Sequence, residues 1–210
     1  SRGLGDVYKR QSKSIRDFKE FNVDRPWKAI SSYQAPLEKA ETFEVYPNRD
    51  SLPFIEDYKF DPTWQVKNFV RGTLRLNGWS SAWQDIFNEI EGLSGKTGDD
   101  RLKEISDQLW NDNAYEKNEP DRVVLCVSLK AEIENSVKWH KTFVMDAWGD
   151  GGESAMSRLV SQPVSLAVEA VIQKKLEAGV QAAPSNIDIV DNWLSIIDEL
   201  AQYLNIIRHN

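Results

Sequence analysis

The sequence predicts an α+β fold, in which a mixed or antiparallel sheet is covered by helices and carries a small helical insertion. Two β-prone runs, 122–133 and 137–148, are separated by a three-residue connection that is typical of a hairpin. Apolar residues recur with helical spacing from Trp79 to Leu93 and again from Ile187 to Ile207. The order and type of these elements together favour α+β.

From residue 12 to residue 42 the sequence is mixed and charged, and we expect an irregular or partly helical lead-in. Residues 43–46 alternate between apolar and polar, which predicts a strand. After the turn at 47–51, Asp50 or Ser51 can cap a short helix that runs to Tyr58, with Pro53 in its first turn.

A second strand is expected over residues 64–76, because Val66, Val70, Leu74 and Leu76 share one face. Asn77 and Gly78 form a turn before the helix at 79–93. Residues 92–100 read as a loop, and a second amphipathic helix ends near Trp110.

The C-terminal part begins with the expected hairpin and continues with a helix that opens at Glu153 or Ser154. Pro163 predicts a kink or two abutting helices, the second from 163 to 178. Gly179 is a plausible C-cap of that second helix, and 187–207 forms the last helix.

Composition excludes several classes of protein. An apolar share of 40% and 8 Trp, 8 Phe and 6 Tyr in 210 residues suffice for a core, which excludes wholesale disorder. A mean hydropathy of -0.53 without a long apolar run predicts no transmembrane helix.

The net charge of -7 argues against nucleic acid or an anionic membrane as a partner. Cys126, alone in an apolar run, fits packing in a reducing compartment and therefore a cytoplasmic location.

The first eleven residues differ in character from the rest. Residues 6–11, DVYKRQ, resemble the in-frame translation of a transposase end, so we expect residues 1–11 to be a non-native scar. The expected organisation is then residues 12–77 as the first part of the α+β domain, 78–118 as the helical insertion, and 119–210 as the remainder.

Three segments resemble the saccharopine dehydrogenase family in its C-terminal substrate and dimerisation domain. That family shows a YPNRDS turn, an RGTLR strand followed by Gly and an aromatic residue, and a late GD…SAM…VG.P helix. This chain has Tyr46–Ser51, Arg71–Arg75, Gly78-Trp79, Gly149-Asp150 and Ser154-Ala155-Met156, in the same order. It departs from the pattern at Ser161-Gln162, where the family has Gly before Pro, and at its end.

The resemblance implies a parent NAD- or NADP-dependent oxidoreductase of lysine metabolism, which converts saccharopine to glutamate and aminoadipic semialdehyde. It also implies a homodimer and an amino-acid substrate. No GxGxxG fingerprint occurs in the chain, so we expect this fragment to bind no cofactor and to be inactive alone.

Saccharopine carries three carboxylates, and the planar fork of Arg binds a carboxylate through two parallel hydrogen bonds. Arg71 and Arg75 would lie on one strand face, with Arg49 and Asn48 on the preceding turn, as a substrate-binding group. Alternatively, this face pairs with acidic residues of a helix or a partner subunit, and the turn is structural. No catalytic residue is assigned.

The remaining candidates have structural interpretations. Gly149–Gly152 precedes a helix, but Asp150 and Glu153 place negative charge at that helix end, which favours a structural connection. His140 is expected on a solvated hairpin, and Asp146 has no partner that its spacing identifies. Two His and one Cys match no zinc signature.

Two further functions stay open. One is a carboxynorspermidine or homospermidine type of polyamine enzyme, whose site would be rich in acidic residues. The other is a non-catalytic dimerisation or binding module, in which the sheet serves as an interface.

Overall fold

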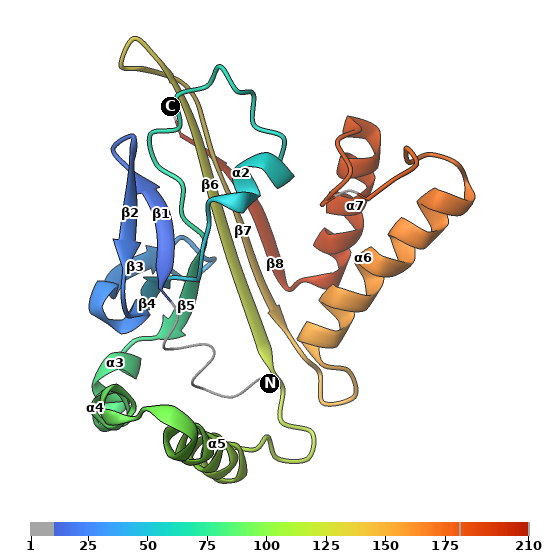
Figure 1. The fold of residues 1–210 in the computed structure, drawn as a ribbon. Coiled ribbons are helices and arrows are strands. Elements are labelled where there is room, and N and C mark those ends of the chain that lie inside the picture. The colour runs from blue at the N-terminus through green and yellow to red at the C-terminus, as the bar shows by residue number, and fades with distance from the viewer. Residues whose placement is uncertain (1–10, 181, 210) are drawn as a thin grey trace. The chain divides into compact units, whose positions relative to one another are not determined.

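The computed structural model describes residues 11–180 and 182–209 (Figure 1). The chain divides into two compact units. The first unit comprises residues up to 34 together with 42–114, and the second comprises 35–41 together with the residues from 115 onward. Apart from Gln11, the expected N-terminal scar lies outside the described residues. The α+β fold class is confirmed.

The first unit opens with an antiparallel hairpin of β1 (Ser12–Arg16) and β2 (Lys19–Val23). Its two-residue turn places Asp17 and Phe18 at φ 46° and 64°, as the twist of a tight hairpin requires. A short 3-10 helix, η1 (Pro26–Ala29), and β3 (Ser31–Ala35) follow. The expected irregular or helical lead-in is therefore wrong, because five-residue strands show too little periodicity in sequence to reveal their cross-strand pairing.

The second sheet has the order β3-β4-β5, and β4 (Glu41–Pro47) confirms the strand expected at 43–46. The helix α2 (Pro53–Asp57) begins with Pro53, and Asp50 Oδ1 accepts a hydrogen bond from the Leu52 N–H just before it. The strand expected over 64–76 is too long, since β5 covers only Gly72–Leu76. Upstream, Phe69 pairs instead with Ile15 through reciprocal backbone hydrogen bonds.

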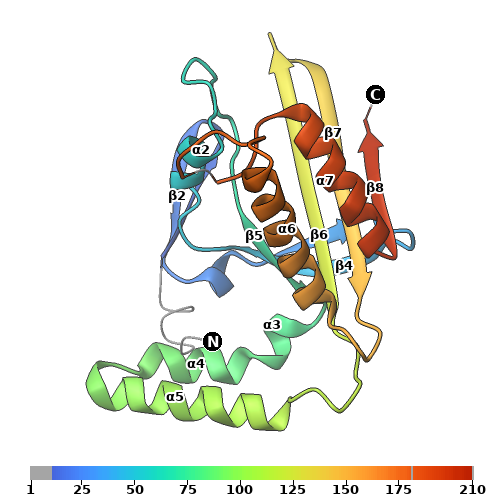
Figure 2. The same cartoon turned by 90° about the vertical axis from the view of Figure 1, so that its right-hand side faces the viewer.

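Three helices complete the first unit: α3 (Trp79–Ala82), α4 (Gln84–Gly92) and α5 (Gly95–Asp112). Figure 2 shows α4 and α5 side by side, and Ile90, Leu102 and Ile105 form the core between them. The loop expected over residues 92–100 is much shorter in the structure and consists of Leu93 and Ser94. Helix α4 ends at Gly92, and helix α5 begins at Gly95.

The second unit is built on the antiparallel sheet β6-β7-β8, with β6 at Arg122–Ile133 and β7 at Ser136–Trp148. The predicted hairpin is confirmed, and its turn residues Glu134 and Asn135 adopt φ values of 50° and 62°. The third strand, β8 (Tyr203–Arg208), pairs with β7.

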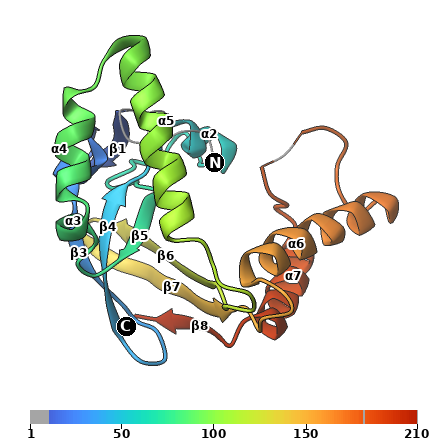
Figure 3. The ribbon, with the colours of Figure 1, turned by 90° about the horizontal axis from the view of Figure 1, so that it is seen from below.

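Two helices follow the hairpin, α6 (Ala155–Ile172) and α7 (Ile187–Leu200), and they lie beside each other in Figure 3. Pro163 does not divide α6 in two. Gly179 is not its C-cap, because Lys174 adopts φ 56° and the N–H groups of Lys174 and Lys175 bond to Val171 and Ala170 in a Schellman motif. The last helix ends at Leu200, since residues 203–208 pair with β7 instead.

In the part of the chain that the structure describes, no helix combines the length and apolar character that a membrane span needs.

Candidate functional site

Arg75 lies in β5 of the first unit, with its guanidinium among aromatic rings. Its Nη2 donates to the hydroxyl of Tyr46 at 3.1 Å, and its Cζ lies 5.3 Å from the ring centre of Trp79. The Tyr46 and Trp79 rings themselves stack at 5.3 Å. The Nε of Arg75 is buried without a hydrogen-bond partner.

Arg71 precedes β5, and its guanidinium contacts a different ring from Arg75. Its Cζ lies 3.6 Å above the ring centre of Phe54 in α2. Of the two arginines, only Arg75 belongs to β5, because the strand begins at Gly72. Among the residues that the structure describes, neither arginine has a carboxylate as an ion-pair partner.

The two sequence motifs, 46–51 and 71–75, are hydrogen-bonded to each other. The Asn48 N–H donates to the Arg71 carbonyl at 2.7 Å, and the Arg71 N–H donates to Ser51 Oγ at 3.0 Å. With the Arg75–Tyr46 bond, these contacts join the turn and the strand into one structural element. Ser51 is fully buried, so its hydroxyl needs a hydrogen-bond partner, and the Arg71 N–H is one.

Arg49 and Asn48 both lie in this turn. Arg49 has φ 52°, and its carbonyl accepts from the Lys13 N–H, while its side chain is exposed. The backbone of the turn is thus structural, and the Asn48 side chain is half-buried.

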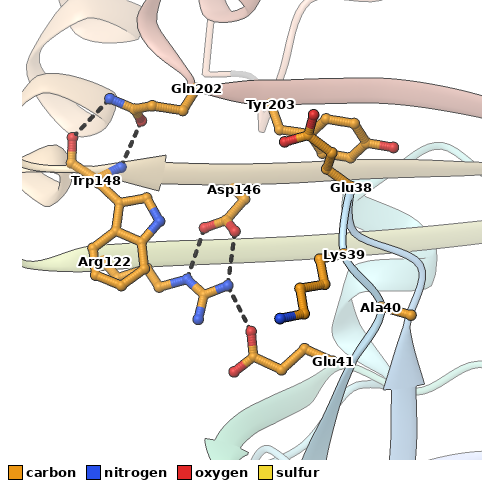
Figure 4. Close-up of a pocket in the computed structure, with 9 residues that line it drawn as sticks. All are labelled: Glu38, Lys39, Ala40, Glu41, Arg122, Asp146, Trp148, Gln202 and Tyr203. Atoms are coloured by element: carbon orange, nitrogen blue, oxygen red, sulfur yellow. Dashed lines mark hydrogen bonds and ion pairs between the residues drawn. The ribbon is translucent and has the colours of Figure 1, made fainter.

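A half-open cavity within the second unit has a volume of about 450 Å³ (Figure 4). Arg122 lies at its wall, between the carboxylates of Asp146 and Glu41. Its Nε and Nη2 donate to the two oxygens of Asp146 at 2.8 and 2.7 Å, and Nη2 also donates to Glu41 at 2.8 Å. The hydrogen bond to Asp146, followed by that to Glu41, outweighs desolvation and raises the pKa of Arg122.

Sequence analysis missed this cluster, although a signal was present. The hairpin register aligns Arg122 with Trp148 and Val124 with Asp146, which makes Arg122 and Asp146 diagonal neighbours on one sheet face. Glu41 reaches the cluster from a segment that is distant in sequence, so no periodicity could have identified it. With two carboxylates on one guanidinium, the cluster is an ion-pair clamp, and it leaves Arg122 poorly suited to bind a further anion.

The loop at 149–152 does not fit a dinucleotide. The first N–H groups of α6, on Ala155 and Met156, already donate to the Asp121 carboxylate at 2.6 and 2.9 Å. Asp150 accepts from the N–H groups of Gly152 and Glu153. The N–H groups at the start of α6 and in the loop before it are therefore already bound by carboxylates of the chain itself, Asp121 and Asp150. This agrees with the interpretation of residues 149–152 as a structural connection.

His140 lies in β7 of the hairpin, where it is half-buried, and its ring stacks on the ring of His209. No group of three or more potential metal ligands occurs among the residues that the structure describes.

Comparison with known proteins identifies the family. The model of the saccharopine dehydrogenase C-terminal domain matches residues 1–206. A curated relative, the NADP(+)-dependent, L-glutamate-forming saccharopine dehydrogenase of Pyricularia oryzae, is 22% identical over 95% of this chain and 58% of its own length.

The solved structure of apo saccharopine dehydrogenase (L-Glu forming) from Saccharomyces cerevisiae has the same fold, with a TM-score of 0.75 and 20% identity. That match covers 100% of this chain and 61% of the yeast chain. The chain thus spans about three-fifths of the relatives that it matches. It belongs to the saccharopine dehydrogenase C-terminal domain family.

Proposed function

We propose that this chain is the substrate domain of a saccharopine dehydrogenase-like oxidoreductase of lysine metabolism, located in the cytoplasm. The whole protein would convert saccharopine to glutamate and aminoadipic semialdehyde with NAD or NADP. The chain alone would be inactive, because it contains no GxGxxG fingerprint and its one glycine-rich helix entry already holds carboxylates.

One observation carries this proposal: two half-buried guanidinium groups lie among aromatic rings with no carboxylate paired to either in the described chain. A guanidinium has five N–H donors, and aromatic faces and one phenol satisfy few of them. Substrate carboxylates would supply the missing acceptors of Arg71 and Arg75. Arg49 and Asn48, on the turn bonded to Arg71, would contribute further donors.

The test is steady-state kinetics of the whole enzyme with Arg71→Ala and Arg75→Ala. Loss of a charged hydrogen bond to substrate costs about 1.5–3 kcal/mol, so we expect KM for saccharopine to rise about tenfold or more. Arg16→Ala is the matched control, because Arg16 also lies over an aromatic ring, Phe21, but belongs to the N-terminal hairpin. Unchanged kinetics in both variants would end the proposal. Turnover of carboxynorspermidine in place of saccharopine by the whole enzyme would favour the polyamine alternative.

A homodimer is the second part of the proposal, and exposed apolar side chains support it. Along β6 they are separated by two or four residues, and along α6 by four, so each set follows one face of its element. They are Leu125, Val127, Leu129 and Ile133 on β6, and Val160, Val164, Val168 and Ile172 on α6.

A further inference from the structure

Two histidines from distant parts of the sequence meet at one end of the β6-β7-β8 sheet. His140 lies in β7, and His209 directly follows β8. Their rings stack with centroids 3.8 Å apart and planes 17° from parallel. The His209 N–H also donates to the His140 carbonyl at 3.1 Å, so the pair is located where the C-terminal strand is attached to the sheet.

A chain of two hydroxyls joins the imidazoles. Thr142, which is buried, donates through Oγ1 to Ser128 Oγ at 3.1 Å. Ser128 Oγ lies 3.1 Å from His140 Nε2, and Thr142 Oγ1 lies 2.9 Å from His209 Nε2.

The direction of this chain fixes where its protons lie. Each hydroxyl has one proton, and that of Thr142 is used on Ser128, so Thr142 faces His209 as an acceptor. Ser128 then gives its own proton to His140. In this arrangement His209 carries a proton on Nε2, and Nε2 of His140 has a lone pair. A proton on Nε2 of His140 would replace the Ser128 hydroxyl as the donor, so that Ser128 Oγ accepts from both Thr142 and His140.

The charges around the pair oppose protonation. Lys130 of β6 lies opposite His140 in the strand register. The Lys130 ammonium also forms an ion pair with Glu132 at 2.6 Å. Lys138 of β7 precedes His140 by two residues, and Lys141 is paired in register with Arg208 of β8. Burial lowers the pKa of His140, and the nearby His209 and Lys130 lower it further.

The direction of the pH effect follows from linkage. A histidine whose pKa is lowered in the folded state binds a proton more readily when the strand end is detached than when it is attached. The attachment is therefore complete above the ordinary histidine pKa of about 6.5, and it weakens as the pH falls below that value.

We propose that His140 and His209, with Ser128 and Thr142, form an acid-released clasp on the C-terminal strand. When the pair is uncharged, the closed hydrogen-bond chain holds the end of β8 against β7. When both imidazoles are protonated, the stacked cations, 3.8 Å apart, repel each other, and the end of β8 detaches. The clasp belongs to neither the proposed substrate group nor the Arg122 clamp.

Amide hydrogen exchange of the 210-residue chain at pH 7.5 and 5.5, corrected for intrinsic rates, tests the clasp. We expect protection of the His209 amide to fall about tenfold at pH 5.5, one factor of ten per pKa unit. The Gly149 amide, which donates to Asp121 beyond the other end of β7, is the internal control and should keep its protection. His140→Gln should remove the pH dependence at His209. Equal protection at both pH values, or wild-type pH dependence in His140→Gln, would overturn the proposal.

Discussion

Arg122 connects β7 with the segment at 35–41, because it binds Asp146 and Glu41 at the same time. Its side chain is 20% exposed and that of Asp146 is 16% exposed, so removing the guanidinium leaves a largely buried carboxylate without its cation. Such an uncompensated charge is strongly destabilising. Arg122 therefore stabilises the second unit through this clamp.

We predict that Arg122→Leu lowers the free energy of unfolding by about 3 kcal/mol, measured by urea denaturation. Arg101→Leu is the matched control, since Arg101 also binds two carboxylates, Glu89 and Glu104, but at the surface. Its effect should be too small to resolve. Similar losses in both variants would show that the clamp contributes no more than a surface ion pair.

Glu44 determines a pH-dependent part of stability in the first unit. Burial raises the pKa of its carboxyl, but hydrogen bonds from Ser80 and Gly78 outweigh burial, so the net pKa is lowered. The carboxylate accepts from the N–H groups of Ser80 and Gly78 at 2.6 and 3.1 Å and so caps α3. Its contribution is present above the ordinary pKa of about 4.3 and is lost as the pH falls through the lower folded value.

We predict that Glu44→Gln is less stable than the wild type at pH 7 and that the difference shrinks between pH 5 and pH 3. Thermal unfolding across this range measures it, with Glu20→Gln, on the exposed face of β2, as control. A difference that stays constant with pH would show that the charge of Glu44 plays no part.

Among the elements, α6 depends for its start on residues outside the helix. Asp121 and the N-cap Ser154 accept from its first N–H groups. Gly149 permits this arrangement, because a Cβ at that position would lie 2.5 Å from Asp121 Oδ1. The glycine is therefore required by packing against the cap.

We predict that Asp121→Ala and Gly149→Ala each destabilise the chain by about 1–2 kcal/mol, because each removes the cap. The double variant should cost clearly less than the sum of the two, since the cap can be lost only once. Denaturation of all four chains of this cycle gives the coupling, and additive effects would refute the shared mechanism.

For the whole molecule, the exposed apolar stripe of α6 predicts self-association. We expect sedimentation velocity to show a concentration-dependent dimer that Val164→Lys weakens, because the substitution places a charge on the stripe. Ser165→Lys, next to it on the exposed helix surface but off the stripe, should leave the dimer intact. A monomer at all concentrations, or equal effects of the two variants, would contradict this.

The sequence by itself determined the fold class, the β6–β7 hairpin, the helices around residues 79–110 and the family. These features are local, because strand alternation, helical spacing and short motifs are visible within a window of about twenty residues. The same short motifs indicate Arg71, Arg75, Arg49 and Asn48 as candidate substrate-binding residues.

Only the tertiary structure decided which distant residues meet. Tyr203–Arg208 continues the helical pattern of α7, yet pairing with β7 makes it a strand, because cross-strand contacts outweigh local propensity. Arg122 finds Glu41, and His140 finds His209, across long stretches of chain. Arg71 contacts the ring of Phe54, and Arg75 donates to the hydroxyl of Tyr46, which are contacts that the sequence does not reveal. Contacts between side chains that are distant in sequence depend on how the whole chain folds, and the spacing of residues along the sequence does not reveal them.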